Sequence, residues 1–333
     1  MSSRSRAETR GHKVDHAEDP ATGGAGPVEF LSVGDIGVDI IARVDHLPSP
    51  GEKLWVDVAS AYPGGMAANA AAVYAALGGS AGIVGRVGPD SHGIISLADL
   101  EARGVDMRYV EEVPDPTFWT VALTTPPGQR ALIQFETPAL WAQPAEGDID
   151  AMVGAAAIHT MAEQGDHVLP LLRAARDRPV TVSIDIESPA VHQDNLTRLV
   201  ALVDVAFVNT EAARALAPTP EGAARAVQAM GPPTVCVTLG ADGALLLDRE
   251  GATTPVRAHE VAVVDVNGAG DSFAAAFMWA RVRGWADHEA VELANAVAAV
   301  STTAHGRSAV INGDGLHSLL DERGVLWEPE AST

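Results

Sequence analysis

The sequence predicts an α/β fold in which a central, mostly parallel sheet is flanked by helices. From residue 28 onward, short runs rich in β-branched residues alternate with helical patterns, which is typical of such a sheet. Hydrophobic residues make up 47% of the chain and aromatic residues only 5%, which suits helices packed tightly on a sheet. Residues 52–60 and 117–136 instead alternate with period two, which predicts a small antiparallel β lid.

The expected elements divide the chain into one large domain and two tails. Residues 1–27 mix both charges with Gly and Pro and predict a disordered tail, residues 28–325 a single α/β domain, and residues 326–333 a C-terminal tail. Strands are expected at residues 29–36, 81–87, 156–161, 180–186, 205–209, 234–239 and 243–248. Helices are expected at residues 66–77, 92–103, 168–176, 221–230, 272–283 and 288–303.

Charge and cysteine content exclude several classes of partner and location. The chain of 333 residues has a formal net charge of −22, so a nucleic acid or an anionic membrane would be repelled. No segment has the uninterrupted apolar run that a membrane span needs. The single cysteine, Cys236, lies in an apolar run, which excludes an internal disulfide and predicts a reducing, cytoplasmic location.

Several recognisable patterns lack the context that their chemistry needs. Neither Lys13 nor Lys53, the only lysines, lies in the Gly-Lys-Ser/Thr sequence of a P-loop. "GGSAG" at residues 78–82 matches a serine-hydrolase pattern, but it follows a helix and precedes a strand, the reverse of a nucleophile elbow. No G-x-G-x-x-G opens a helix after the first strand and no H-E-x-x-H occurs, so dinucleotide and zinc sites lack support.

The stretch "VVDVNGAGDSF", residues 263–273, has a more informative context. Residues 260–266 predict a strand, a glycine turn follows, and an apolar helix begins after it. The backbone amides of Gly268, Ala269 and Gly270 can converge on an anion at this helix N-terminus. Asp271 would repel a phosphoryl group there unless it accepts a proton from an attacking hydroxyl. A helix-capping aspartate is the alternative, and the turn alone leaves both open.

A second constellation lies in "PGGMAANAAAVYAALGG", residues 63–79. Gly64 and Gly65 precede an alanine-rich helix that carries Asn69 in its first turn. Asparagine has a poor helix propensity and no capping position there, so a ligand partner would explain it. Close packing of the helix on a strand, with Asn69 bonded to a neighbouring loop, is the alternative.

Together these motifs resemble the ribokinase family of carbohydrate kinases, also called the phosphofructokinase B group. The resemblance covers residues 28–320 and rests on motifs in the family's order: "GDIGVD", "GGMAAN" with "ALGG", "VGRVGPDSHG", "FVNTEA", "VTLGADG" and "DVNGAGDSF". It implies a kinase that transfers the γ-phosphoryl group of ATP, with Mg²⁺, to a hydroxymethyl group of a sugar or sugar derivative. The alternatives are a nucleoside kinase of the same family or an inactive sugar- or nucleotide-binding regulator.

The resemblance also implies roles for individual residues. Asp271 matches the catalytic base, and residues 268–270 match the anion hole. The substrate-binding candidates are Asp39, Gly65, Asn69 and the lid residue Arg130. The ATP-binding candidates are Asn209, Thr238, Gly240 and Asn295. Glu211 is the candidate for ordering Mg²⁺, although the family's pattern is Asn, two residues, then Glu, and Glu211 stands one position earlier. Potassium is expected as an activator at a site formed by Asp265, Asn267, Ser301, Ala304 and Gly306.

The motifs constrain the identity of the substrate and the oligomeric state least. Gly37 and Met66 stand where ribokinase itself has an asparagine and a lysine, so ribose is not implied. A neutral sugar, or one with a single acidic group, is expected because the chain is poor in lysine. Trp55, Phe118 and Trp119 are candidate lid aromatics that face substrate or pack within the lid. Pairing of lid strands between two subunits predicts a homodimer.

Overall fold

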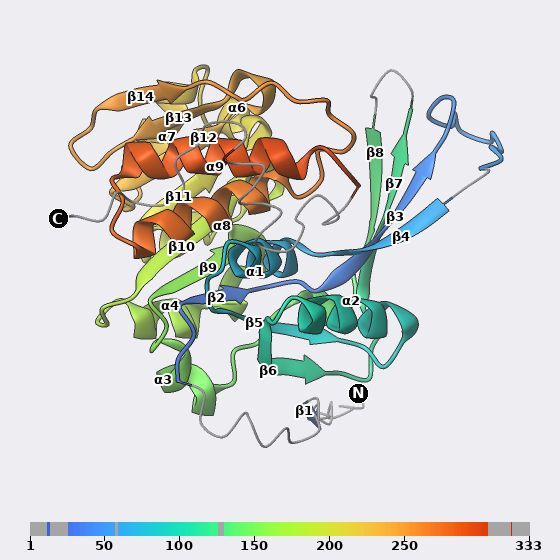
Figure 1. Ribbon diagram of the computed structural model, residues 1–333, viewed down its shortest axis with the longest axis horizontal. Coiled ribbons are helices and arrows are strands. Elements are labelled where there is room, and N and C mark those ends of the chain that lie inside the picture. The colour runs from blue at the N-terminus through green and yellow to red at the C-terminus, as the bar shows by residue number, and fades with distance from the viewer. Residues whose placement is uncertain (1–11, 14–25, 57–58, 126–129, 306–320, 322–333) are drawn as a thin grey trace, which may run out of the picture.

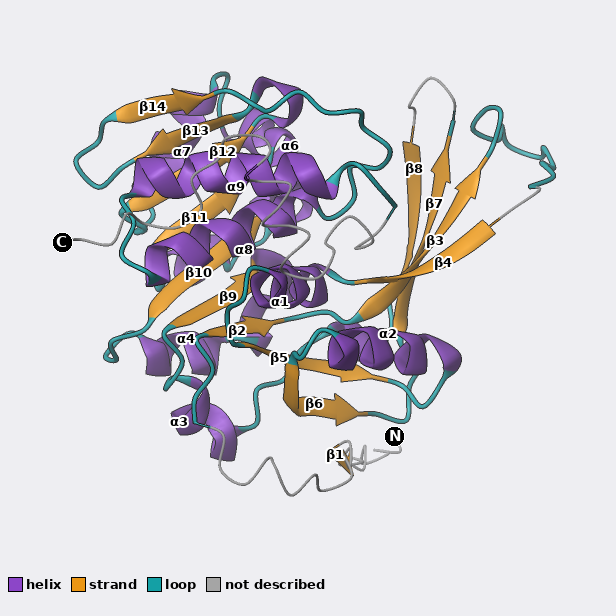
Figure 2. Ribbon diagram, viewed as in Figure 1, coloured by secondary structure: helices purple, strands orange, loops and turns teal. Residues whose placement is uncertain are grey.

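Two sheets form the framework of the computed structural model, which describes residues 12–13, 26–56, 59–125, 130–305 and 321 (Figures 1 and 2). The larger sheet has the strand order β1-β6-β5-β2-β9-β10-β11-β12-β13-β14. Antiparallel pairing within it is confined to β1 with β6, β12 with β13, and β13 with β14. Its strands are β1 (His12–Lys13), β2 (Phe30–Val33), β5 (Ala81–Val87), β6 (Asp106–Glu112), β9 (Ala157–Met161), β10 (Thr181–Ile186), β11 (Val205–Val208), β12 (Thr234–Thr238), β13 (Ala244–Leu247) and β14 (Thr253–Val256).

Helices cover both faces of the larger sheet, and each face has its own hydrophobic core (Figure 2). Neighbouring residues of β2 show this, because Phe30 belongs to one core and Leu31 to the other. One face carries α1 (Met66–Ala76), α2 (Ser91–Ala102), α8 (Ala269–Val282) and α9 (Asp287–Ser301). The other carries α3 (Ile149–Met152), α4 (Leu169–Ala175), α5 (Leu196–Val200), α6 (Thr210–Leu216) and α7 (Pro220–Gln228). Among the described helices, none is long and apolar enough to span a membrane.

The smaller sheet forms a lid that projects from the main body beside α2 (Figure 1). Its strand order is β4-β3-β7-β8. β3 pairs parallel with β7, and the other two pairings are antiparallel. The strands are β3 (Gly37–Arg43), β4 (Ala59–Gly64), β7 (Phe118–Thr124) and β8 (Arg130–Phe135).

The motif "VGRVGPDSHG" joins the lid to the body. Asp90 Oδ1 accepts a hydrogen bond from the Gly93 amide at 2.9 Å and thereby caps α2. Asp90 Oδ2 accepts from the Thr117 amide, also at 2.9 Å, directly before β7. A Cβ on Gly88 would lie 2.1 Å from the Asp115 carbonyl oxygen, so glycine permits the close approach of these loops.

The predicted fold class is confirmed, and the expected strands of the main sheet and the expected helices coincide with observed elements to within a few residues. The strand expected at residues 260–266 is wrong, because this segment is not a strand and pairs with none of the described strands. Its Val264 and Asp265 amides donate instead to the Thr302 carbonyl, at 2.8 and 3.1 Å, beyond the end of α9. A helix terminus therefore holds the backbone that leads to the glycine turn.

The first two strands of the lid in sequence, β3 and β4, differ from the prediction. The strand expected at residues 52–60 is β4, which begins only at Ala59, and residues 57–58 lie outside the described residues. β3 was not foreseen, since the first predicted strand ended at residue 36, and no strand was predicted at the positions of β6 and β14. In the predicted N-terminal tail, His12 and Lys13 pair with Glu112 and Glu111 of β6. Apart from residues 26–27, the rest of both predicted tails lies outside the described residues.

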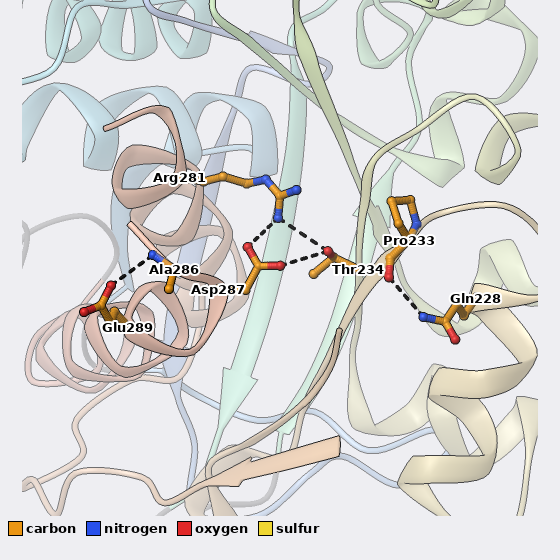
Figure 3. A network of polar contacts seen from close by, with 7 residues as sticks. All are labelled: Gln228, Pro233, Thr234, Arg281, Ala286, Asp287 and Glu289. Atoms are coloured by element: carbon orange, nitrogen blue, oxygen red, sulfur yellow. Dashed lines mark hydrogen bonds and ion pairs between the residues drawn. The ribbon is translucent and has the colours of Figure 1, made fainter. Parts of the chain in front are cut away.

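A polar network fixes β12 at the end opposite the glycine turn (Figure 3). Arg281 Nη1 donates to Asp287 Oδ1 at 2.5 Å and to Thr234 Oγ1 at 3.4 Å. Thr234 Oγ1 donates in turn to Asp287 Oδ2 at 3.0 Å. Because these residues link the end of α8 and the start of α9 to β12, they help to place Thr238, which ends the same strand.

Candidate active site

Asp271 lies in the first turn of α8, directly after the glycine turn. Gly268 precedes the helix with a left-handed backbone, φ 75°, which favours glycine. A Cβ at this position would lie 3.2 Å from Asn69 Nδ2, so space as well as conformation favours glycine. The Ala269 amide donates to the Val266 carbonyl at 3.3 Å. Since the first N–H groups of a helix lack intrahelical acceptors, this turn is suited to bind an anion.

Asn69 joins α1 to α8 across the site. Its Nδ2 donates a 2.7 Å hydrogen bond to Asp271 Oδ2, which explains an asparagine in an alanine-rich helix. Its Oδ1 is buried and has no hydrogen-bond partner among the described residues. Because an unpaired buried acceptor costs about 1–3 kcal/mol, this oxygen is suited to accept a hydrogen bond from a substrate hydroxyl.

A cavity of about 250 Å³ lies between the lid and the glycine turn, and is called here the lid cavity. Its lid residues are Asp39, Phe118, Thr120, Leu132 and Gln134. Its other lining residues are Asp35, Gly65, Met66, Asn69, Asp185, Glu187, Phe207, Asn209, Thr238, Asn267, Gly268, Gly270 and Asp271. Thr120 Oγ1 donates to Asp39 Oδ1 and so orients that carboxylate. A Cβ on Gly64 would lie 2.6 Å from Asp39 Oδ2, so glycine leaves room for it.

Asp35 and Gly65 shape the start of α1 beneath this cavity. Asp35 Oδ2 and Oδ1 accept hydrogen bonds from the amides of Met66 at 3.1 Å and Ala67 at 3.2 Å. Gly65 has φ 93°, and a Cβ there would lie 2.6 Å from the Asp35 carbonyl oxygen. The first Asp of "GDIGVD" therefore caps the helix, while the second, Asp39, lines the cavity.

A second cavity, of about 570 Å³, adjoins the first and is called here the nucleotide cavity. Thr238 and Gly270 line both cavities, so the glycine turn stands at their junction. Its lining residues are Thr238, Gly240, Ala241, Gly243, Ala258, His259, Glu260, Val261, Val263, Val266, Ala269, Gly270, Phe273, Asn295, Ala298, Ala299 and Thr302. Asn295 Nδ2 is bonded to the carbonyls of Val256 and Arg257, each at 3.4 Å. The largely apolar wall fits a flat heterocycle.

Burial and carboxylate crowding govern the electrostatics of the lid cavity. Burial raises the pKa of Asp271 well above its ordinary value; the Asn69 hydrogen bond opposes the rise, and nearby carboxylates add to it. Burial likewise raises the pKa of Asp35 and, more strongly, that of Asp185. Of the lining residues that the structure describes, none is Lys, Arg or His. The cavity is therefore suited to neutral hydroxyl groups and to cations.

The predicted site residues divide into those at the cavities and those away from them. The candidates Asp271, Gly268, Gly270, Asp39, Gly65, Asn69, Asn209, Thr238, Ala269, Gly240 and Asn295 all line one or both cavities. Glu211 is exposed on the first turn of α6 and lines neither cavity. Arg130 is the first residue of β8, opposite Thr124. Phe118 lines the lid cavity, whereas Trp119 stacks on Phe135 with ring centroids 3.7 Å apart, and Trp55 is 95% exposed.

The candidate potassium ligands lie beside the nucleotide cavity. Asp265 is buried, and its Oδ1 accepts a hydrogen bond from the Asn267 amide at 3.0 Å. His305 Nδ1 lies 3.5 Å from Asp265 Oδ2. Ser301 Oγ donates to the Ala298 carbonyl at 2.8 Å. Ala304 directly precedes His305 in the chain, and Gly306 lies outside the described residues.

Sequence reasoning missed Asp35, Thr120, Asp185 and Glu187 as cavity residues. Asp185 stands at the carboxyl end of β10, and Glu187 follows that strand. In open α/β sheets ligands bind outside the carboxyl ends of the strands, so an acidic residue ending a buried strand is a usable signal. Thr120 carried no such signal, because its role depends on which face of β7 turns inward.

Comparison with known proteins assigns the chain first to a class of enzyme, the phosphotransferases that act on an alcohol group of a carbohydrate. The chain belongs to the pfkB family of carbohydrate kinases, which matches residues 29–312. The predicted resemblance to the ribokinase family is thereby confirmed.

Relatives and solved structures match over nearly the whole domain. The ATP-dependent ribose-1-phosphate kinase of Halopiger xanaduensis is 31% identical, over 89% of this chain and 99% of the relative. The structure of Arabidopsis thaliana ribokinase complexed with ribose and ATP has a TM-score of 0.75 at 27% identity, covering 89% of this chain and 99% of that one. A ribokinase II candidate from E. coli, in complex with ATP and Mg²⁺, has a TM-score of 0.76 at 25% identity, with coverage of 89% and 99%.

Proposed function

We propose that this protein transfers the γ-phosphoryl group of MgATP to a hydroxymethyl group of a sugar or sugar derivative. The observation that carries the proposal is the place of Asp271, which is buried at the N-terminus of α8 where the two cavities meet. The lid cavity fits an acceptor sugar, and the nucleotide cavity fits a nucleoside triphosphate. Membership of the pfkB family and the likeness to a ribokinase with bound ribose and ATP support it.

The roles of the residues follow from their positions. Asp271 accepts the proton of the attacking hydroxyl, and the amides of the 268–270 turn stabilise charge on the transferring group. The Asn69 hydrogen bond holds the Asp271 carboxylate toward the acceptor. In a loose transition state the proton leaves late, so this positioning matters more than basicity. Magnesium that arrives with the triphosphate supplies charge neutralisation and orientation of the phosphates.

Acceptor binding rests on Asp39 and Asn69. Thr120 fixes the rotamer of Asp39, whose carboxylate can accept hydrogen bonds from sugar hydroxyls. Asn69 Oδ1 supplies a further buried acceptor. The lid strands cover this cavity, which keeps water from competing with the sugar for the phosphoryl group.

The direct test is sugar-dependent formation of ADP and a phosphorylated product from MgATP, measured over a panel of sugars and nucleosides. A product with at least one sugar is expected. Saturable ATP binding without any product would favour a nucleotide-binding regulator instead.

Potassium is expected to raise activity relative to sodium or a large organic cation at equal ionic strength. The residues that motivate this, Asp265 and Asn267, adjoin the glycine turn, so a monovalent ion there would hold the turn's amides in place. Initial rates in the three salts provide the measurement. Equal rates would remove Asp265 and its neighbours from a role in ion binding.

Lid pairing is expected to make the protein a homodimer. Trp119, Phe135 and Ile133 lie on the lid face opposite the cavity residues, and Ile133 and Phe135 are 50% and 39% exposed. β4 and β8 are edge strands among the described residues, so both apolar area and strand edges favour association. Sedimentation equilibrium should give twice the 34.4 kDa chain mass. Ile133→Lys should shift it toward one chain mass, and a wild-type monomer would contradict the proposal.

A further inference from the structure

Two carboxylates at the end of β10 border the glycine turn and have no part in the roles assigned above. Asp185 and Glu187 line the lid cavity together with Gly270 and Asp271. A Cβ on Gly270 would lie 3.9 Å from Asp185 Oδ2, which places that carboxylate beside the turn that is suited to bind phosphate. Any triphosphate seated on the turn would therefore bring its cation close to Asp185.

The surroundings of Asp185 are those of a group that requires a cation. Asp185 is only 6% exposed, and no described side chain donates a hydrogen bond to it. The carboxylates of Glu187 and Asp271 line the same cavity as Asp185. The Glu163 carboxylate adds to this crowding, because both of its oxygens are buried without a partner among the described residues. Carboxylates crowded in this way are costly unless positive charge reaches them.

Glu187 is held in place by Asn209. Asn209 Nδ2 donates to Glu187 Oε1 at 3.2 Å, while Asn209 Oδ1 accepts from the Ala212 amide at 2.8 Å and caps α6. The asparagine of the motif "FVNTEA" is thus committed to orienting a carboxylate. Position 212, where a glutamate would complete the spacing Asn, two residues, Glu, holds the buried Ala212. Glu211 is exposed and lines neither cavity.

We propose that Glu187 and Asp185, rather than Glu211, hold the magnesium of bound MgATP through its water ligands. The proposal rests on the ATP-dependent activity proposed above. Mg²⁺ prefers oxygen partners and keeps several of its waters, so two carboxylates and the phosphates suffice to position it. The described residues contain no group of three or more His, Cys, Asp or Glu that could hold a metal ion directly, in keeping with water-mediated contact. Asn209 is then a positioning residue that acts through Glu187.

The test measures metal binding itself, with Mn²⁺ as the paramagnetic probe and a non-hydrolysable ATP analogue on the full chain. Electron paramagnetic resonance gives the Kd of Mn²⁺ for the enzyme–analogue complex. Glu187→Gln and Asp185→Asn should each raise this Kd by about 10-fold or more, as loss of an outer-shell carboxylate does at other metal sites. Glu211→Gln, and Glu221→Gln on α7 as a matched exposed control, should leave it within about twofold of the wild-type value.

The outcomes separate this inference from the proposed function. A wild-type chain that binds no ATP analogue and phosphorylates no sugar would overturn the proposed function. Suppose instead that the wild-type chain binds the analogue and phosphorylates a sugar. Normal Mn²⁺ binding by Glu187→Gln and Asp185→Asn would then overturn only the inference, and so would a loss of Mn²⁺ binding confined to Glu211→Gln.

Thermal melting checks that the variants are folded. Because each removes a carboxylate from a crowded cluster, their Tm should equal or exceed that of the wild type. Asn209→Ala should weaken Mn²⁺ binding less than Glu187→Gln does.

Discussion

Replacing Asp271 by alanine is expected to lower kcat by about 10²- to 10⁴-fold, the range for a positioned general base, while KM changes little. The reason is its place beside the anion-binding turn, with its carboxylate held by Asn69 at 2.7 Å. The measurement is steady-state kinetics with a sugar that the wild type phosphorylates. Asp271→Asn is the matched variant, since it keeps the shape of the side chain and removes the base.

Stability separates this role from a purely structural one. The N-cap of α8 is Gly268 and no side chain caps the helix, so a structural Asp271 would act only as a negative charge in the first turn. Loss of such a charge would lower the free energy of unfolding by about 0.3–1 kcal/mol and leave turnover nearly intact. The pKa of Asp271 is raised above its unfolded value, first by burial, so its charged form destabilises the fold at neutral pH. We therefore expect Asp271→Asn to raise Tm while it abolishes most turnover. Normal turnover with a lowered Tm would assign Asp271 to the structural role alone.

The same shift gives the direction of the pH dependence. A base must be ionised to accept the proton, so kcat/KM should fall as pH falls through the raised pKa of Asp271. The acidic limb should consequently lie above the pH at which an ordinary aspartate titrates. Bound Mg²⁺ favours the ionised form of Asp271. The acidic limb of the kcat profile should therefore lie at a lower pH than the acidic limb of the kcat/KM profile.

Local sequence patterns were sufficient for the central strands of the main sheet and for the glycine turn. The strands β9 to β13 are short buried runs rich in apolar residues and α8 follows its turn, so short windows of sequence determine them. The segment 260–266 misled the same reasoning, because its alternating valines line a cavity and face solvent instead of entering a sheet. A period-two pattern reports which residues are apolar and does not report what covers them.

Residues that act in pairs across the fold could not be found in this way. Asn69 and Asp271 were singled out separately, but their hydrogen bond joins α1 to α8 over 202 positions of sequence. Glu187 and Asn209 follow adjacent strands, β10 and β11, and meet only because those strands are parallel neighbours. The spacing rule that led to Glu211 considers one segment only, so it carries no information about a carboxylate that comes from another segment.

Neutral sugars are expected to exceed phosphorylated sugars as substrates by more than about 100-fold in kcat/KM, or about 2.7 kcal/mol of transition-state preference. A phosphate dianion needs Arg, Lys or several amide donors. The described lining of the lid cavity has no Lys, Arg or His, and its carboxylates are Asp35, Asp39, Asp185, Glu187 and Asp271. Met66 lines the cavity with an uncharged side chain.

The likeness to a ribose-1-phosphate kinase makes this preference a sharp test. The measurement is kcat/KM at saturating MgATP for ribose, fructose, a keto sugar acid, ribose 1-phosphate, fructose 6-phosphate and adenosine. A phosphorylated sugar whose kcat/KM exceeds that of the neutral sugars by 100-fold would contradict the argument from the cavity lining. In that event Arg130→Ala, at the start of β8, should abolish the preference if the lid supplies the missing cation. Of the lid aromatics Trp119 and Phe118, only Phe118 lines the cavity, since Trp119 is committed to stacking on Phe135. The kcat/KM of adenosine should therefore remain below that of the best neutral sugar.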